Sequence, residues 1–214
     1  TTKSTYSLCS NCAVHTGFNS GYNAVAAAVK TGVQNLKAKY RGSRLIVTGH
    51  SLGGALAILC TADLKSLFGT IDLTYTFGQP RVGNDAFSSW YQSQHPNTYR
   101  LVDYADIVPH LPPSSFGFLH GGHQIWYQRG MQTYTICEPE SPSCANSIDR
   151  ANYSTDDHSL DNYIKLKAIQ EPESGKNIRS DEEDEENWKK TELRKLNEFL
   201  IIFGEEYTYK LEFS

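Results

Sequence analysis

A serine between two glycines is the first group in this chain that could do nucleophilic chemistry. The segment Gly49-His50-Ser51-Leu52-Gly53 has the spacing G-x-S-x-G. This spacing is typical of a sharp turn between a strand and a helix that exposes the serine hydroxyl at its tip. A side chain at Gly49 or Gly53 would clash across so tight a turn. The helix N-terminus beneath the serine favours a developing negative charge.

The residues that flank this turn have the composition it requires. Arg44 to Thr48 is a short apolar run that predicts a buried strand. Small and apolar residues after the turn indicate a helix: Ala55, Leu56, Ile58, Leu59, Ala62 and Leu67. We therefore predict that Ser51 is a nucleophile.

A serine nucleophile needs a base to take its proton, and the base needs a carboxylate to orient it. On this kind of turn the chain order is serine, acid, histidine. We predict His158 as the base because it lies late in the chain, in a loop after the last expected strand. Four other histidines are interpreted as structural or surface groups: His95 before a proline in an expected surface loop, His110 before Leu-Pro-Pro, and His120 and His123 before a strand.

Two aspartates that follow an expected strand are candidates for the acid. Asp106 precedes Ile107-Val108-Pro109, and an apolar, proline-stiffened surround would shield and fix a carboxylate. We predict Asp106 as the orienting acid and keep Asp103 as the alternative.

The expected elements alternate between strands and helices, which predicts a parallel α/β sheet. In such sheets, functional residues gather at the carboxyl ends of the strands, where Ser51 and Asp106 would both lie. Residues 1–12 are predicted to be loop-like. The expected helices cover about 19–40, 52–69 and 85–94, the expected strands about 44–48, 71–77 and 98–102, and a hairpin about 124–127 with 132–136.

The five cysteines favour disulfides over a metal site. Cys9 and Cys12 form a C-x-x-C, but Cys137 and Cys144 are too far apart to complete a zinc pattern. We predict two local disulfides, Cys9–Cys12 and Cys137–Cys144, with Cys60 free. Such usage indicates an oxidising, extracellular compartment.

The charge and the hydropathy exclude several classes of partner. The formal net charge is −4, and no basic stripe indicates nucleic acid. No apolar run is long enough to predict a transmembrane segment. The first residues do not form a signal peptide, and we interpret them as the start of a mature form or a fragment.

The composition shifts near residue 170, which predicts a domain over 1–170 and a charged extension over 171–214. Asp181 to Glu186 is a run of acidic residues. Helical spacing of apolar residues follows at Leu193, Leu196, Leu200 and Phe203. We interpret the extension as a solvated linker with an amphipathic helix, and a partner-docking helix is the alternative.

Several motifs together resemble the class 3 lipases of the fungal triacylglycerol lipase type. They stand in the family's order over about residues 9–165. The matching segments are Val14 to Phe18, Thr48 to Ala55, Phe77 to Asn84, Asp106 to Pro113, Phe116 to Gly122, and Asp157-His158.

The resemblance implies an α/β-hydrolase fold in which Ser51, Asp106 and His158 hydrolyse an ester through an acyl-enzyme. The Leu52 backbone N–H would be one oxyanion donor, and the two predicted disulfides are similar to those of such enzymes. The resemblance implies a secreted enzyme with a lipid or ester substrate and transient contact with a lipid interface. No cofactor and no metal are expected.

The resemblance also sets expectations about activity. Family members carry a further N-terminal segment with a strand, a second oxyanion donor and a lid, so the fold expected here is partial. We therefore expect weak or no turnover from these 214 residues alone. Two alternatives are a feruloyl-type or other carboxylesterase, and a non-catalytic interaction protein on the same scaffold.

Overall fold

The computed structural model describes residues 2–130, 132–164, 198–203 and 209–213. The helices are α1 (Thr16–Lys39), α2 (Leu52–Phe68), α3 (Asp85–Gln94) and α4 (Leu160–Ile164). The strands are β1 (Lys3–Thr5), β2 (Ala13–His15), β3 (Arg44–His50), β4 (Leu73–Phe77), β5 (Thr98–Asp103), β6 (His123–Tyr127), β7 (Tyr134–Cys137), β8 (Glu198–Phe203) and β9 (Tyr209–Phe213).

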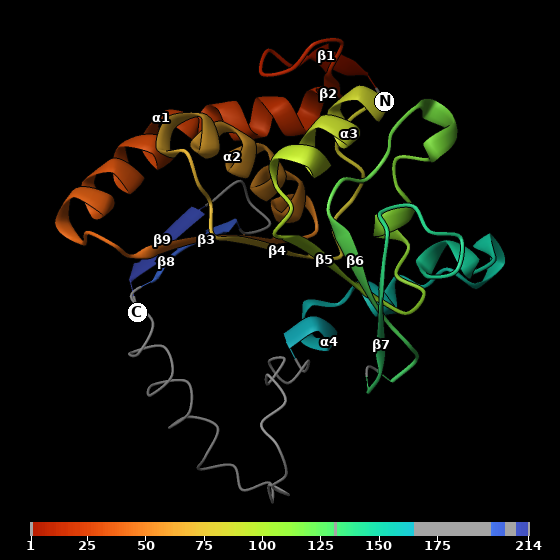
Figure 1. Cartoon of the computed structure of the whole chain (residues 1–214). Helices are drawn as coiled ribbons and strands as arrows, with labels where there is room; N and C mark the ends of the chain where they lie inside the picture. The colour runs from red at the N-terminus through yellow and green to blue at the C-terminus, as the bar shows by residue number, and fades with distance from the viewer. Residues whose placement is uncertain (1, 131, 165–197, 204–208, 214) are drawn as a thin grey trace, which may run out of the picture.

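A central sheet with the strand order β7-β6-β5-β4-β3-β8-β9 organises the molecule. The neighbouring strands from β6 to β8 run parallel, whereas β7 and β9 close the two ends antiparallel. Helices α1, α2 and α3 cover one face, and the short α4 lies on the other (Figure 1). The predicted α/β architecture, with the hairpin of β6 and β7, is confirmed.

Alternation along β4 explains how the sheet is covered. Thr74 and Thr76 are buried on the face of the helices, where the Thr74 hydroxyl lies 2.8 Å from that of Thr61 in α2. Helix α2 is apolar on all sides because it is packed between α1 and the sheet, and most of its residues are buried. A fully buried leucine such as Leu56 or Leu59 contributes about 2 kcal/mol to folding.

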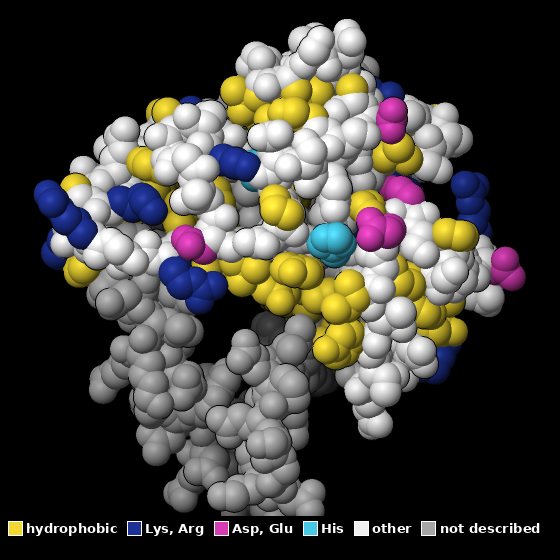
Figure 2. All heavy atoms as spheres, in the orientation of Figure 1, with side chains coloured by type: hydrophobic (Ala, Val, Ile, Leu, Met, Phe, Trp, Pro, Cys, Tyr) yellow, Lys and Arg dark blue, Asp and Glu magenta, His cyan; other side chains and the backbone are white. Residues whose placement is uncertain are grey.

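The opposite face of the sheet carries a second apolar cluster. Buried Leu101, Ile125 and Tyr127 pack there with Tyr163 of α4, and half-buried rings from β4 and β5 adjoin them. Figure 2 shows hydrophobic side chains gathered along this face, below the sheet in that view. The α4 helix is therefore anchored by the side chain of Tyr163.

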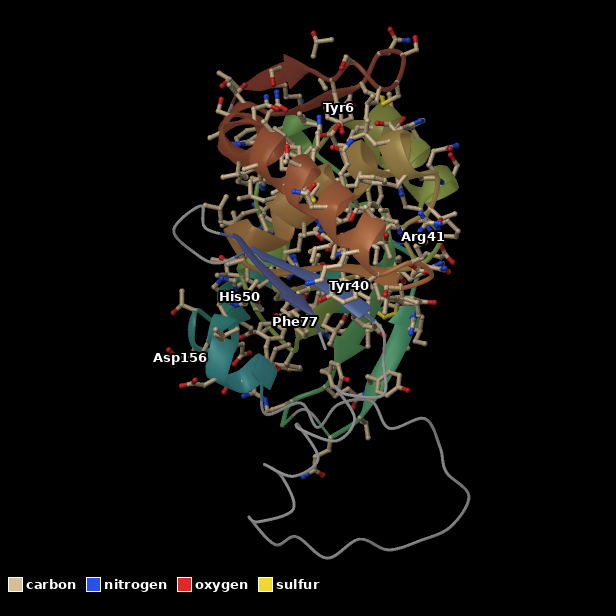
Figure 3. The ribbon with its side chains drawn as sticks, turned by 90° about the vertical axis from the view of Figure 1, so that its left-hand side faces the viewer. Tyr6, Tyr40, Arg41, His50, Phe77 and Asp156 are labelled. Atoms are coloured by element: carbon tan, nitrogen blue, oxygen red, sulfur yellow. A yellow bond between two sulfur atoms is a disulfide. The ribbon has the colours of Figure 1, made fainter. Side chains whose placement is uncertain are left out.

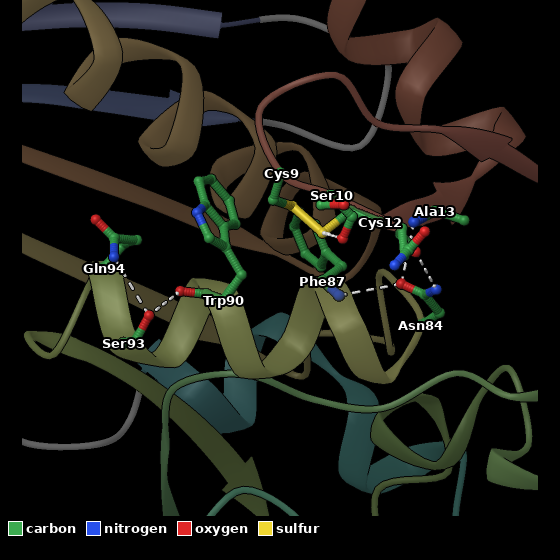
Figure 4. The surroundings of a disulfide bond; sticks show 10 residues. Cys9, Ser10, Cys12, Ala13, Asn84, Phe87, Trp90, Ser93 and Gln94 are labelled. Atoms are coloured by element: carbon green, nitrogen blue, oxygen red, sulfur yellow. Dashed lines mark hydrogen bonds between the residues drawn. A yellow bond between two sulfur atoms is a disulfide. The ribbon is translucent and has the colours of Figure 1, made fainter.

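The prediction that residues 1–12 are loop-like is wrong for Lys3–Thr5, which pairs antiparallel with β2. The predicted Cys9–Cys12 disulfide is present and lies in the turn between the two strands. Asn84 then holds this hairpin against α3, because its side-chain oxygen accepts N–H bonds from Ala13 and Phe87, each 3.0 Å long (Figure 4). Polar strands of three residues give no period that sequence patterns can detect.

The second predicted disulfide, Cys137–Cys144, is also present. Within the loop that it closes, Glu140 accepts two hydrogen bonds from the buried Arg81 guanidinium, at 2.9 and 3.0 Å. Burial is the largest single influence on Glu140 and opposes its ionisation, but the bonds from Arg81, the charges of His120 and Arg81 and the bond from the His120 N–H together lower the pKa of Glu140 to about 2. Arg81 also donates to the carbonyl oxygens of His110 and Pro112, so this ion pair braces the loop after β5.

The helix expected from Leu193 to Phe203 is a further correction. Residues 198–203 form strand β8, which pairs parallel with β3. Phe199 to Phe203 is an aromatic and aliphatic run that suits a strand, and the edge of β3 offers unpaired N–H and C=O groups. Leu193, Leu196 and the acidic run at 181–186 lie outside the described residues.

In the part of the chain that the structure describes, no helix has both the length and the apolar content needed to cross a membrane.

Candidate active site

The turn at Ser51 has the geometry that its glycines predict. Ser51 adopts φ 54° and ψ −125°, a conformation in which an L-residue is strained. Its N–H donates to the Phe77 carbonyl oxygen at 2.9 Å, which ties the turn to the end of β4. A Cβ at Gly49 would lie 2.2 Å from the Gly53 carbonyl oxygen, so no side chain fits there.

Three side chains that sequence reasoning selected lie in one hydrogen-bonded chain. The Ser51 Oγ is 2.7 Å from His158 Nε2, and His158 Nδ1 lies 3.0 and 2.9 Å from the two carboxylate oxygens of Asp106. A carboxylate only accepts, so Nδ1 carries the proton and Nε2 presents its lone pair to the serine hydroxyl. This arrangement can take a proton from Ser51 and hold the resulting imidazolium against Asp106.

Asp106 is fully buried and has two further donors. Its Oδ1 accepts from the Val108 N–H at 2.8 Å, and its Oδ2 accepts from the Tyr163 hydroxyl at 2.6 Å. Burial, followed by the charge of Asp106, raises the pKa of Tyr163 well above its ordinary value, so the phenol keeps its proton. The carboxylate is therefore fixed from three sides.

Sequence reasoning missed Tyr163. It lies 57 residues beyond Asp106, and it reaches the carboxylate only because α4 turns back under the sheet. A tyrosine in a short, mostly polar segment gives no local signal of this contact.

Asp103, the alternative acid, ends β5 and is nearly buried. Its N–H donates to the Tyr163 hydroxyl at 3.0 Å, whereas the carboxylate that accepts from His158 Nδ1 is that of Asp106. Burial, together with the charges of Asp157 and Asp106, raises the pKa of Asp103 to about 7.

His50, at the end of β3, and Gly78, directly after β4, lie next to His158. The His50 ring stacks on His158 with centroids 4.7 Å apart, and its Nε2 donates to the His158 carbonyl oxygen at 3.0 Å. Figure 3 shows His50 beside Phe77, its partner across the two strands. Gly78 has φ 56°, and a Cβ there would lie 2.7 Å from Asp106 Oδ2 and 2.9 Å from the His158 ring, so glycine is required next to this pair.

The four other histidines that were considered as the base lie elsewhere. His120 donates from Nε2 to the Pro109 carbonyl oxygen at 2.7 Å, and His110 stacks on Tyr153 and bonds to its hydroxyl at 3.0 Å. His123 begins β6. His95 was expected in a surface loop, but it is buried against the ring of Tyr91, and burial lowers its pKa to about 4.

Leu52 is the first residue of α2. The first N–H groups of a helix have no partner within the helix. The Leu52 N–H, directly after Ser51, is one of these groups, and its role as an oxyanion donor stays a prediction.

Comparisons with known proteins agree on one family. A family model described as lipase (class 3) matches residues 1–116. A lipase from Rhizomucor miehei is 41% identical over 142 residues, which are 63% of this chain and 39% of that protein. Secreted mono- and diacylglycerol lipase 1 from Fusarium solani is 40% identical over 136 residues, or 63% of this chain and 40% of that protein.

A comparison with solved structures indicates the same family. The crystal structure of a lipase from Rhizopus microsporus var. chinensis matches with a TM-score of 0.70 at 39% sequence identity, over 73% of this chain and 56% of that chain. The chain thus spans less than half the length of the two relatives above and just over half of this structure.

Proposed function

We propose a function from one premise: the chain belongs to the class 3 lipase family. The proposed activity is hydrolysis of carboxylic esters of lipids, as in a triacylglycerol lipase. The observation that carries the proposal is the hydrogen-bonded chain from Ser51 through His158 to Asp106, with Ser51 Oγ 2.7 Å from His158 Nε2.

The proposed reaction proceeds through an acyl-enzyme. Ser51 Oγ attacks the ester carbonyl carbon while His158 Nε2 takes the hydroxyl proton. The tetrahedral intermediate then collapses, the bond to the alcohol breaks, and the imidazolium gives its proton to that alcohol. Water repeats the sequence on the acyl group and releases the fatty acid. Asp106 holds the imidazole in the Nδ1–H form and stabilises the imidazolium.

The Leu52 N–H is proposed as one donor to the oxyanion. One such donor typically lowers the barrier by about 3–4 kcal/mol. The dipole of α2 points the same way, because its N-terminus lies below Ser51. Weak or no turnover is proposed for these 214 residues alone, because they span less than half the length of the two relatives above.

Exposed apolar side chains in the segments that follow the proposed acid and base support a lipid substrate and transient contact with a lipid interface. Leu160 follows His158 by two residues and is 43% exposed, and Leu111 and Phe116, after Asp106, are 43% and 58% exposed. Such side chains suit an acyl chain or a lipid surface rather than a hydrated, charged substrate.

Compartment and domain organisation are also proposals. The two disulfides and the secreted relatives support secretion. Residues 1–170 are proposed as the lipase-like domain and 171–214 as an extension that contributes β8 and β9 to the sheet.

The test is turnover of short- and long-chain p-nitrophenyl esters, together with labelling by a fluorophosphonate probe. We expect weak turnover that Ser51→Ala abolishes, and a probe bound covalently to Ser51 only. A preference for emulsified long-chain substrate supports a lipase, whereas activity on feruloyl esters that does not respond to an interface supports the carboxylesterase alternative. An unlabelled Ser51 in a folded chain would contradict the proposal.

A further inference from the structure

The proposed acid and base stand on two loops that pair through their main chains. The Ser154 N–H donates to the Ala105 carbonyl oxygen at 2.9 Å, and the Ile107 N–H donates to the Ser154 carbonyl oxygen at 3.2 Å. These bonds align Ser154 beside Asp106. They end four residues before His158, so they do not by themselves fix the imidazole.

A side-chain bond spans this remaining distance. The carboxylate of Asp157, the residue before His158, accepts the Ala105 N–H through Oδ2 at 3.1 Å. The Asp157 N–H in turn donates to Ser154 Oγ at 3.0 Å. One end of this link is next to His158 and the other end is next to Asp106.

The donor in this link is a buried main-chain group. Ala105 is 1% exposed, so its N–H would lose its partner if the Asp157 carboxylate were removed. A buried, unpaired N–H is costly, and the loop would shift to satisfy it elsewhere. Because Ala105 directly precedes Asp106, such a shift changes the position of the Asp106 carboxylate relative to His158.

We propose that Asp157 is a positioning residue that holds His158 in line with Asp106 by accepting the Ala105 N–H. The inference rests on the proposed roles of Ser51, His158 and Asp106. Asp157 acts through the loop and does not touch the substrate.

A carboxylate at this place has an electrostatic cost. The charge of Asp157, after burial, is the largest factor that raises the pKa of Asp103 to about 7. The hydrogen bond to Ala105 requires only an acceptor oxygen. An asparagine at 157 therefore keeps the link without the charge, whereas an alanine removes both.

The test compares Asp157→Ala, Asp157→Asn and the matched control Asp156→Ala, which changes the exposed neighbour in the same turn. With kcat normalised to the fraction of chains that a fluorophosphonate labels, Asp157→Ala should lower kcat by about 10- to 100-fold, the range expected for a misplaced catalytic group, with KM within about twofold. Asp157→Asn should stay within about threefold of the wild-type kcat, and Asp156→Ala should match the wild type.

A second readout does not depend on turnover. The His158 Nδ1–H that bonds to Asp106 should give a downfield proton NMR signal in the wild type, in Asp157→Asn and in Asp156→Ala. We expect Asp157→Ala to lose that signal or move it upfield while it still unfolds cooperatively. This readout holds even if Ser51→Ala leaves turnover unchanged, which would contradict the proposed function alone.

Two results would overturn the inference. One is an unchanged Nδ1–H signal in Asp157→Ala. The other is an equal loss of the signal in Asp157→Ala and Asp157→Asn, which would assign the effect to the charge of Asp157 rather than to its hydrogen bond.

Discussion

The two sides of the proposed site are held in place by different means. Ser51 stands on a turn that backbone geometry fixes: a strained φ, a glycine that leaves no room for a Cβ, and an N–H bonded to β4. His158 and Asp106 are 52 residues apart, and main-chain and side-chain hydrogen bonds between their two loops hold them together. The serine side of the site, the turn around Ser51, is thus formed by residues close together in the sequence. The imidazole side, His158 with Asp106, is formed by two segments far apart in the sequence.

The difference extends to packing. The serine turn leads into α2, which is largely buried. The His158 side chain is 20% exposed, and the only helix that follows it in the described residues is the short α4. The imidazole side therefore depends on a few polar contacts, and single substitutions should affect its chemistry more than its folding.

Asp106→Asn should give the largest effect, because it breaks the imidazole side without changing its shape. An asparagine amide can turn its N–H₂ toward His158 Nδ1, which favours the Nε2–H form that cannot accept the Ser51 proton. Loss of the correct imidazole tautomer typically lowers kcat by about 10⁴-fold. The measurement is single-turnover acylation by a p-nitrophenyl ester, with circular dichroism to verify folding.

Asp103→Asn is the control for this experiment, because Asp103 is the alternative acid. We expect its acylation rate to stay within about threefold of the wild type. A larger loss in Asp103→Asn than in Asp106→Asn would reverse the assignment of the acid.

Gly49→Ala should break the serine side through folding rather than chemistry. The new methyl group would lie 2.2 Å from the Gly53 carbonyl oxygen, and the backbone on both sides is fixed. We expect the free energy of unfolding to fall by about 3 kcal/mol, the upper range for overpacking. Urea denaturation measures this directly.

Gly42→Ala is the matched control for the steric effect. Gly42 has φ 85° and open space around it, so an alanine there meets only backbone strain, about 1–2 kcal/mol. Equal losses in the two variants would show that crowding at Gly49 contributes nothing.

The contrast between local and long-range contacts also explains how much of the fold and the site could be predicted from the sequence. The serine turn, the helix after it and the parallel strands have local patterns, since β-branched runs and glycine spacing act within a few residues. The disulfides followed from short cysteine spacings. The order of serine, acid and histidine selected Asp106 and His158, and the structure brings both to Ser51.

What the sequence could not predict depends on tertiary contacts. Tyr163 becomes a partner of Asp106 only through the return of α4. Residues 198–203 have helical spacing as well as β-forming side chains, and the free edge of β3 decides in favour of a strand. His95 looked exposed because a proline follows it, yet it is buried beside Tyr91 at the end of α3.

The smallest expected effect is an electrostatic cost in the free energy of folding, which arises where the loop of Asp106 meets the loop of His158. Their contact places three carboxyl groups near one another: Asp103, Asp106 and Asp157. The pKa of Asp103 is raised from 3.8 to about 7, so between these values the folded chain keeps a proton on Asp103 that the unfolded chain has lost. When the unfolded state binds fewer protons, stability falls as pH rises. Asp103 by itself therefore contributes a loss of stability from about pH 4 to pH 7. His95 and His110, whose pKa values burial lowers to about 4, act in the opposite direction over part of this range, so the contribution of Asp103 is measured as a difference from a variant that lacks this carboxyl group.

Asp103→Asn removes this titration and leaves the contributions of the histidines in place, so the difference in stability between the two proteins should grow with pH. At pH 4 the variant and the wild type should have nearly equal stability, because both then carry a neutral side chain at this position. At pH 8 the variant should be more stable, by on the order of 2 kcal/mol. Urea denaturation at intervals between pH 4 and pH 8 tests this. A difference in unfolding free energy that stays constant over that range would mean that the ionisation of Asp103 beside Asp106 and Asp157 does not destabilise the fold.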